Sequence, residues 1–153
     1  MDVRIVDFPA TRVAAVEHRG PPALEHETAR RLVAWRIANG LSPERHASYG
    51  VHYTDPWTTP PAEHRVDFCV AFAGPVAPND EGVVAKTIPG GRCAMVRHHG
   101  SRENVGAAAY LYEEWLPASG EAAGDFPIFF HYVNVGPHVR EEDMITDVYL
   151  PLR

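Results

Sequence analysis

The histidines are the first residues in this 153-residue sequence that could hold a metal ion or carry protons, and there are nine of them. His98 and His99 are adjacent, so on a strand their side chains point to opposite faces and cannot easily share one ion. The sequence contains no HExxH and no CxxC pattern, the spacings that bring two ligands together. His18 and His98 each stand at the end of an apolar strand pattern, which suggests a shared structural role. We therefore interpret the histidines as structural or surface residues and predict no metal.

Residue types that act as nucleophiles or bind phosphate occur in unsuitable contexts. The glycine-rich run Ile88-Pro89-Gly90-Gly91 leads into a strand pattern, whereas a phosphate site needs a helix N-terminus. Ser119-Gly120 ends a helical pattern, and no GxSxG elbow is present. Cys69 and Cys93 lie in apolar segments, which is typical of small buried hydrophobes in a reducing compartment. The sequence therefore predicts no catalytic residue and no cofactor, and it favours a binding protein over an enzyme.

The aromatic residues are more informative about function. Trp35 and Trp115 fit a helix face that packs on a core, whereas Tyr53, Tyr112 and Tyr149 fit a core and a ligand groove equally well. Tyrosines at a groove offer a flat apolar face with a polar tip, which suits planar, amphipathic or cationic ligands.

The elements that position these residues come in two copies. At a shift of 80 residues, Phe8–Gly40 aligns with Ile88–Gly120 without a gap, with ten identities in 33 positions. Composition alone would give roughly two or three. Asp67 matches Asp147 at the same shift, which suggests a structural job for both, and His52-Tyr53 matches His131-Tyr132 at a shift of 79. The sequence is therefore an internal duplication.

Periodicity predicts the elements of each copy. The first copy has a strand around residues 13–16, a helix over 25–39 that ends at a left-handed Gly40, and strands near 47–54 and 65–72. The second has a strand over 92–98, a helix over 103–116 that ends at Pro117 and Gly120, and strands near 129–133 and 145–150. Residues 74–82 form a loop between the copies.

Two such strand–helix–strand–strand units predict an α+β fold with a largely antiparallel sheet and two helices on one face. Neither unit is large enough to bury its own helix and sheet well. Side by side they form one domain over residues 1–153, with repeat one at about 1–75 and repeat two at about 82–153. The pseudo-twofold between them leaves a groove where the helices diverge, and concave junctions of this kind are preferred ligand sites.

Charge and hydropathy exclude several classes of partner. The net charge is −6, and the short basic runs Arg30-Arg31 and Arg97-His98-His99 are too small to follow a nucleic-acid backbone. No stretch approaches eighteen consecutive apolar residues, and the N-terminus does not resemble a signal peptide. We therefore expect a cytoplasmic protein that contacts neither nucleic acid nor membrane directly.

Several motifs together resemble the GyrI-like small-molecule-binding domains. They are YGVHYTDPWTTP (49–60), RVDFCV (65–70), IPGG (88–91), LYEEWLPASG (111–120) and TDVYLPL (146–152), in the family's order and spacing over nearly the whole chain. The resemblance implies the same duplicated fold and an aromatic-lined pocket, to which Tyr112 and Tyr149 match. The family includes stand-alone proteins, gyrase inhibitors among them, and effector-binding domains of AraC-type and MerR-type multidrug-responsive activators. This sequence resembles the stand-alone class.

One departure from the family pattern bears on the ligand. Many members carry a glutamate in a P-x-F-E-x-Y strand, where it meets cationic ligands or serves a hydrolytic activity; here Phe130 replaces it. Without that carboxylate a cation loses its partner and water activation loses its base. We therefore expect a preference for neutral or aromatic compounds, with His131 as a polar contact if it faces inward. With these two residues, the expected ligand-binding set is Tyr53, Tyr112, Trp115, Phe130, Tyr149 and His131.

Three functions follow as hypotheses. The first is a module that sequesters or senses a drug-like aromatic or amphipathic small molecule. The second is a hydrolase that acts on a strained electrophile, for which Glu113, Glu114 or Asp147 would have to replace the missing carboxylate. The third is a protein-interaction module such as a gyrase antagonist, which rests on family analogy alone.

Overall fold

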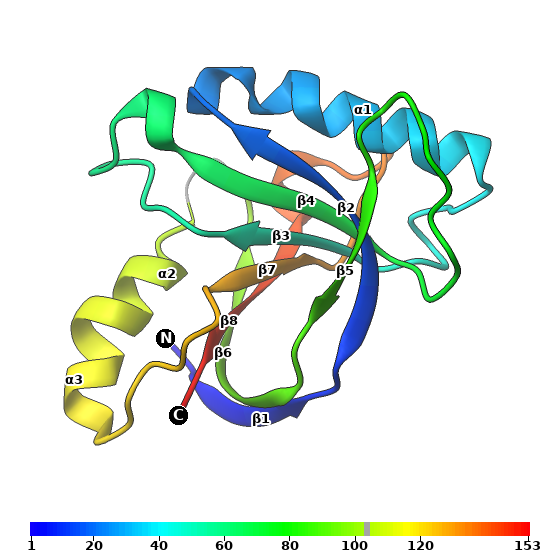
Figure 1. Ribbon diagram of the computed structural model, residues 1–153. Helices are drawn as coiled ribbons and strands as arrows, with labels where there is room; N and C mark the ends of the chain where they lie inside the picture. The colour runs from blue at the N-terminus through cyan, green and yellow to red at the C-terminus, as the bar shows by residue number, and fades with distance from the viewer. Residues whose placement is uncertain (103–104) are drawn as a thin grey trace.

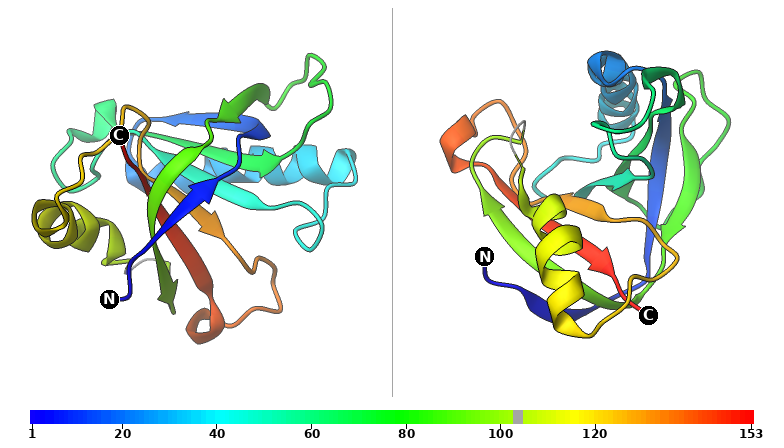
Figure 2. Two further views of the ribbon diagram at one scale, coloured as in Figure 1. Left: turned by 90° about the horizontal axis from the view of Figure 1, so that it is seen from below. Right: turned by 90° about the vertical axis from the view of Figure 1, so that its left-hand side faces the viewer.

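The computed structural model describes residues 1–102 and 105–153, and these residues form one eight-stranded antiparallel sheet (Figure 1). The strand order is β1-β6-β8-β7-β3-β4-β2-β5. The strands are β1 (Arg4–Phe8), β2 (Thr11–Arg19), β3 (Ser48–His52), β4 (Arg65–Ala71), β5 (Val84–Ile88), β6 (Gly91–His99), β7 (Phe129–Tyr132) and β8 (Ile145–Pro151). The sheet is strongly curled (Figure 2). The predicted α+β class and antiparallel sheet are confirmed.

The two predicted helices differ in regularity. The first is a plain α-helix, α1 (Glu25–Ala38), preceded by a 3-10 turn (Pro22–Leu24) and followed by Gly40 at φ 69° as predicted. The second is built of α2 (Ala107–Tyr110), a π-helical turn η3 (Leu111–Trp115) and α3 (Leu116–Ser119). Its predicted start at residues 103–104 lies outside the described residues.

Pro117 does not end the second helix, contrary to the prediction. It lies in the first turn of α3, and the helix runs on to Ser119 before Gly120 ends it at φ 77°. A proline inside an α-helix cannot donate the usual hydrogen bond, and its ring crowds the carbonyl four residues earlier. The turn directly before Pro117 is π-helical, with the Leu116 backbone N–H donating to the Leu111 carbonyl five residues earlier. Two further 3-10 turns, Pro61–Glu63 and Glu141–Asp143, precede β4 and β8.

Strand pairing places the two copies in register at a shift of 80. His18 lies opposite Val66 as His98 lies opposite Thr146, and Gly50 pairs with Phe68 as Phe130 pairs with Val148. His52 therefore corresponds to Tyr132, and the sequence match of His52-Tyr53 with His131-Tyr132 at a shift of 79 is out of structural register by one residue.

Each unit contains one strand that was not predicted, and this strand pairs with the other unit instead of its own. β1 of the first copy pairs with β6 of the second, and β5 of the second pairs with β2 of the first. β1 does not fold back on β2: the chain bends near Pro9 and runs on as β2 (Figure 1). Gly90 in the equivalent bend lies so close to the first that a Cβ there would be 2.7 Å from the Ala10 backbone nitrogen. A glycine is needed for the two bends to pack together.

Side chains of the sheet alternate between two apolar layers. On one face α1 packs on β2 and β4 through Leu32 and Trp35. On the same face α2 contacts β6 and β8, and Ala107 of α2 and Leu111 of η3 are buried in the core there. We call this face the helix side. The opposite face holds a second core of buried residues, namely Phe8, Val13, Ala15, Tyr49, Val51, Cys69, Ile88, Cys93 and Phe129. The two predicted helices therefore do lie on one face, over the outer strands.

Candidate functional site

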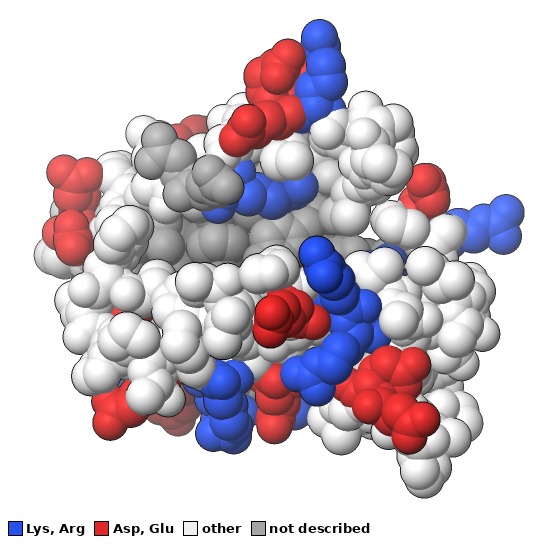
Figure 3. All heavy atoms as spheres, turned by 90° about the horizontal axis from the view of Figure 1, so that it is seen from above, with Lys and Arg blue, Asp and Glu red and all other residues white. Residues whose placement is uncertain are grey.

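The central strands β3 and β7 lie between the two helices on the helix side. α1 contacts β2 and β4, whereas α2 contacts β6 and β8. Gly50 pairs directly with Phe130 in the middle of this strand pair, at equivalent positions of the two copies, so the pseudo-twofold passes between them. The surface seen from above is hollowed between two raised rims, with positive and negative side chains interspersed (Figure 3). The predicted groove is thus the space above β3 and β7.

Aromatic rings form the bottom of this groove. The ring centroids of His52 and Phe130 are 4.3 Å apart at an interplanar angle of 39°, and those of Phe130 and Tyr132 are 6.4 Å apart. The Tyr132 hydroxyl occupies the space where a side chain at Gly50 would lie. All three residues are of intermediate exposure. We call Gly50, His52, Phe130 and Tyr132 together the groove floor.

His52 carries a polar atom that finds no partner in the described part of the chain. Its Nε2 is out of contact with solvent and has no hydrogen bond there. Burial, and secondarily the neighbouring His64, lowers the pKa of His52 from the ordinary 6.5 to about 4. The imidazole is therefore neutral at physiological pH, with one N–H donor and one lone pair.

One end of the groove floor adjoins a hydrogen-bond network at the start of α1. His64 is 1% exposed, and its Nε2 donates to Glu25 Oε2 at 2.8 Å while its Nδ1 shares a 2.9 Å hydrogen bond with Thr54 Oγ1. Thr54 Oγ1 also accepts the Arg65 backbone N–H, just as Asn134 Oδ1 accepts the Ile145 N–H in the second copy. Thr54 thus closes a turn, and both His64 nitrogens are occupied. A Thr–His–Glu row is present here without a free nucleophile or base.

The Tyr132 side of the groove floor adjoins an arginine, Arg102, whose guanidinium is already hydrogen-bonded within the protein. The Arg102 guanidinium lies 5.2 Å from the centre of the Tyr132 ring. It donates to Thr146 Oγ1 at 3.0 Å and to the carbonyls of Asn134 and Ile145 at 3.0 and 2.8 Å. Burial lowers the pKa of Arg102. This cation therefore ties the second copy's turn to β8 and is not free to bind an anion.

Three of the predicted site residues lie on the helix side. Phe130 is part of the groove floor, and Trp115 packs with it against the core beneath the second helix. Tyr112 is 43% exposed and belongs, like Trp115, to the π-helical turn. Burial raises the pKa of Tyr112, and a hydrogen bond with the backbone of Ile128, the residue before β7, partly offsets this. π-helical turns occur frequently at functional sites, which adds weight to Tyr112.

The other three predicted residues lie on the opposite face. Tyr149 stacks on Phe129 with centroids 5.0 Å apart and an angle of 7°. His131 lies 5.0 Å from the Tyr49 ring, and its pKa is lowered mainly by burial. Tyr53 donates to Asp67 Oδ2 at 3.0 Å. His131 therefore does not face the groove, because it lies one residue from Phe130 on the same strand.

The repeat-related aspartates and histidines, for which the sequence suggested a structural role, take part in hydrogen bonds and ion pairs within the fold. Asp67 is 1% exposed and accepts from Lys86 Nζ at 2.8 Å as well as from Tyr53. Asp147 binds Arg97 through both carboxylate oxygens, at 2.8 and 3.0 Å. His18 Nε2 donates to the carbonyls of Gly20 and Pro21, and His98 Nε2 bonds to the Ser101 carbonyl.

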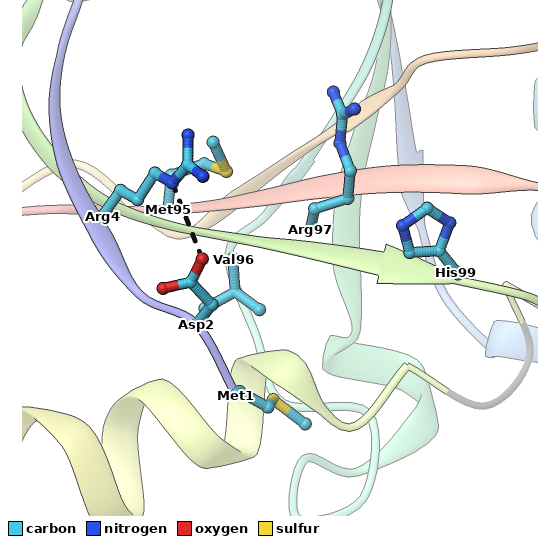
Figure 4. A pocket seen from close by; sticks show the side chains of 7 residues that line it. All are labelled: Met1, Asp2, Arg4, Met95, Val96, Arg97 and His99. Atoms are coloured by element: carbon cyan, nitrogen blue, oxygen red, sulfur yellow. Dashed lines mark ion pairs between the residues drawn. The ribbon is translucent and has the colours of Figure 1, made fainter.

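Two hollows lie away from the groove floor. A cavity of about 450 Å³ adjoins the N-terminus and is lined by Met1, Asp2, Arg4, Met95, Val96, Arg97 and His99 (Figure 4). Its arginines are both paired, Arg4 with Asp2 at 3.7 Å and Arg97 with Asp147. A void of about 20 Å³, room for about one water molecule, is lined by residues including Tyr53, Asp67, Lys86 and Phe126. Neither is lined by Phe130, Tyr112 or Trp115.

Within residues 1–102 and 105–153, no cluster of three or more His, Cys, Asp or Glu side chains could hold a metal ion. The described helices include none long and apolar enough to cross a membrane. Burial raises the pKa of both cysteine thiols, that of Cys93 to about 11, so neither is an activated nucleophile.

Known proteins resemble this chain over its whole length. The "Probable transcriptional regulator YgiV" of Escherichia coli K12 is 39% identical over 154 residues, covering 99% of this chain and 96% of that protein. A "DNA gyrase inhibitor" of Erwinia billingiae is 28% identical over 157 residues, covering 99% and 97%. The crystal structure of the EcmrR C-terminal domain superposes with a TM-score of 0.76 at 12% identity, over 99% of this chain and 97% of that one, and so shows the same fold. The family model for the GyrI-like small molecule binding domain matches residues 1–153, and the chain belongs to that family.

Proposed function

We propose that this chain binds uncharged aromatic small molecules in the groove between α1 and the second helix, and that it senses or sequesters them. The observation that carries the proposal is the groove floor: the rings of His52, Phe130 and Tyr132 lie side by side on the strands between the two helices, in residues of intermediate exposure. Planar ligands gain both burial and offset or edge contacts on such rings. Tyr112 and Trp115 on the π-helical turn supply the wall.

The preference for uncharged ligands rests on where the acids are. Phe130 stands at the strand position where the family motif carries a glutamate. Among the described residues, Glu25 is a carboxylate that adjoins the groove floor, and it accepts a hydrogen bond from His64. Burial raises the pKa of Tyr132, and the charge of Glu25 raises it further. Within residues 1–102 and 105–153, a cation in this groove would therefore be desolvated without a free carboxylate partner, which is costly.

A regulatory role is supported by the name of the E. coli relative, which is a probable transcriptional regulator. The hydrolase hypothesis is weaker, because Asp147 lies on the opposite face with Arg97, and Glu113 and Glu114 are exposed. The hypothesis of a gyrase antagonist is supported only by the name of the Erwinia relative.

Tryptophan fluorescence tests the proposal. Trp57 is 91% exposed and would dominate the background, so the titrations use a Trp57→Phe protein in which Trp115 reports on the groove. Triphenylphosphine oxide and tetraphenylphosphonium are an uncharged and a cationic aromatic compound of similar bulk. Saturable quenching by the oxide at lower concentration than by the cation is the expected result. Equal or stronger binding of the cation contradicts the charge preference, and no response to either contradicts binding in the groove.

A further inference from the structure

An unpaired buried polar atom in the groove floor needs an explanation. His52 Nε2 has no hydrogen-bond partner within the described residues and is shielded from solvent. Leaving such an atom unpaired is costly, and native proteins rarely do so without a reason. The same ring lies 4.3 Å from Phe130, the residue at the centre of the groove.

Three groups next to His52 do not satisfy this atom. The Phe130 ring and the cross-strand partner Val66 are apolar. His64, the polar side chain that acts on His52, uses both of its nitrogens for Glu25 and Thr54. The His52 backbone N–H is itself bonded to the Ile128 carbonyl and does not compete for Nε2.

The fold does not require a histidine at this position. The equivalent residue of the second copy is Tyr132, which shows that an aromatic ring without an imidazole nitrogen fits the same place on the central strands. Structural contacts of the turns recur in both copies: Thr54 accepts the Arg65 N–H in the first, and Asn134 accepts the Ile145 N–H in the second. His52 Nε2 does not recur, so it is a property of this groove and not of the repeat.

We propose that His52 Nε2 is the hydrogen-bonding group that recognises a polar edge of the bound molecule, so that the ligand is an uncharged aromatic compound carrying a hydroxyl, carbonyl or ring nitrogen. This inference rests on the proposed function. The ligand ring would pack on Phe130 while its polar edge pairs with Nε2. A site that pairs a polar ligand group discriminates strongly against the analogue that lacks it, because the site's own polar atom is otherwise left unpaired.

The experiment measures binding of 2-naphthol and 2-methylnaphthalene by equilibrium dialysis. The two compounds have nearly the same shape, and only the first can hydrogen-bond. The wild-type chain is expected to bind 2-naphthol at least about tenfold more tightly, the difference that one well-made hydrogen bond provides. His52→Phe is expected to lose that preference, so that the ratio of the two dissociation constants falls to about one. His52→Gln, which places an amide near the Nε2 position, is expected to restore part of it.

His131→Phe is the matched control, because it makes the same change one strand away on the opposite face and should leave the preference intact. If His52→Phe retains the full preference for 2-naphthol, His52 is not the recognising group, although the groove still binds. If neither compound binds the wild-type chain, the proposed function fails and the inference fails with it.

Thermal unfolding of the free proteins gives an independent result. Removing an unpaired buried nitrogen is expected to raise the unfolding midpoint of His52→Phe above that of wild type and of His52→Gln. A midpoint of His52→Phe below both would mean that Nε2 has an internal partner, and this outcome overturns the inference whether or not any ligand binds.

Discussion

Gly50 and Phe130 face each other across the two central strands, at the same position of the two copies, and one has no side chain while the other has a ring. This asymmetry shapes the groove floor. The Tyr132 hydroxyl extends into the space that Gly50 leaves open, so that a Cβ at position 50 would overlap it. The ring of Tyr132 is in turn held between the sheet and Arg102.

Gly50→Ala is therefore expected to destabilise the protein by about 1–3 kcal/mol, the usual cost of forcing an extra methyl group into a packed region. Urea unfolding measures the change. The double variant Gly50→Ala/Tyr132→Phe removes the hydroxyl that the methyl group meets and should recover most of the loss relative to Tyr132→Phe alone. If the double variant loses as much as the single one, the cost arises from the strand backbone and not from Tyr132.

Phe130→Glu should reverse the charge preference of the groove. The carboxylate would stand at the centre of the floor, where an aromatic cation can pair with it. The expected result is tighter binding of tetraphenylphosphonium and weaker binding of triphenylphosphine oxide, by about tenfold or more each, since 1.4 kcal/mol corresponds to a factor of ten. Phe130→Leu, which is apolar but lacks the ring, is the control and should weaken both compounds without reversing their order.

Tyr112→Ala and Tyr149→Ala should separate the two faces of the sheet. Tyr149 stacks on Phe129 in the core of the opposite face, so its loss is expected to cost about 2–4 kcal/mol of stability without a matching loss of ligand affinity. Tyr112 is 43% exposed on the π-helical turn, so its loss should cost little stability and weaken ligand binding. A loss of affinity in Tyr149→Ala, measured under conditions where the variant is fully folded, would place the ligand on the other face.

The sequence predicted the architecture because duplication and periodicity are both local signals. The helix of the first copy and all six strands of the two predicted units appear within a few residues of their expected bounds. The exchanged strands β1 and β5 were missed, because Arg4–Phe8 and Val84–Ile88 pair only with the other copy and carry mostly exposed side chains. Nothing in five such residues indicates a partner about 80 positions away.

The site was harder to predict because it depends on the face of the sheet. Grouping Phe130 with His131 and Tyr149 mixed two faces, since neighbours on a strand alternate and Tyr149 pairs with Phe129. His52 could have been found by combining the shift of 80 with the alternation of side chains along a strand. When Gly50 is placed opposite Phe130, residues 50, 52, 130 and 132 all lie on one face of the sheet. The match at a shift of 79 concealed this.

Lys86→Met tests the structural role assigned to the repeat-related aspartates. Asp67 is almost fully buried, and Lys86 is the cation that neutralises it. Removing that cation leaves a buried carboxylate with one hydrogen bond from Tyr53, and an expected loss of about 3 kcal/mol in urea unfolding. Arg97→Met is the matched change in the second copy, where the arginine is half-exposed, so we expect about 1 kcal/mol there. Equal losses in the two variants would contradict the importance of burial.

Acid should weaken the fold through His52. Burial, and then His64, lowers the pKa of this imidazole from 6.5 to about 4 in the folded protein. Between those two values the unfolded chain binds more protons than the folded one, so the free energy of unfolding falls as the pH drops from 6.5 towards 4. The full shift corresponds to at most about 3 kcal/mol.

The measurement compares wild type with His52→Phe in urea at pH 7.5, 6.0 and 4.5. His64 and Glu25, the titratable groups nearest to His52 from the loop before β4 and from α1, remain in both proteins, so the difference between the two curves isolates His52. The stability gap between the variant and wild type should be smallest at pH 7.5 and widen in favour of the variant as the pH falls. A gap that stays constant from pH 7.5 to 4.5 would mean that His52 takes up its proton as readily in the folded chain as in the unfolded one. The desolvated, unpaired nitrogen at the centre of the recognition argument would then not exist in solution.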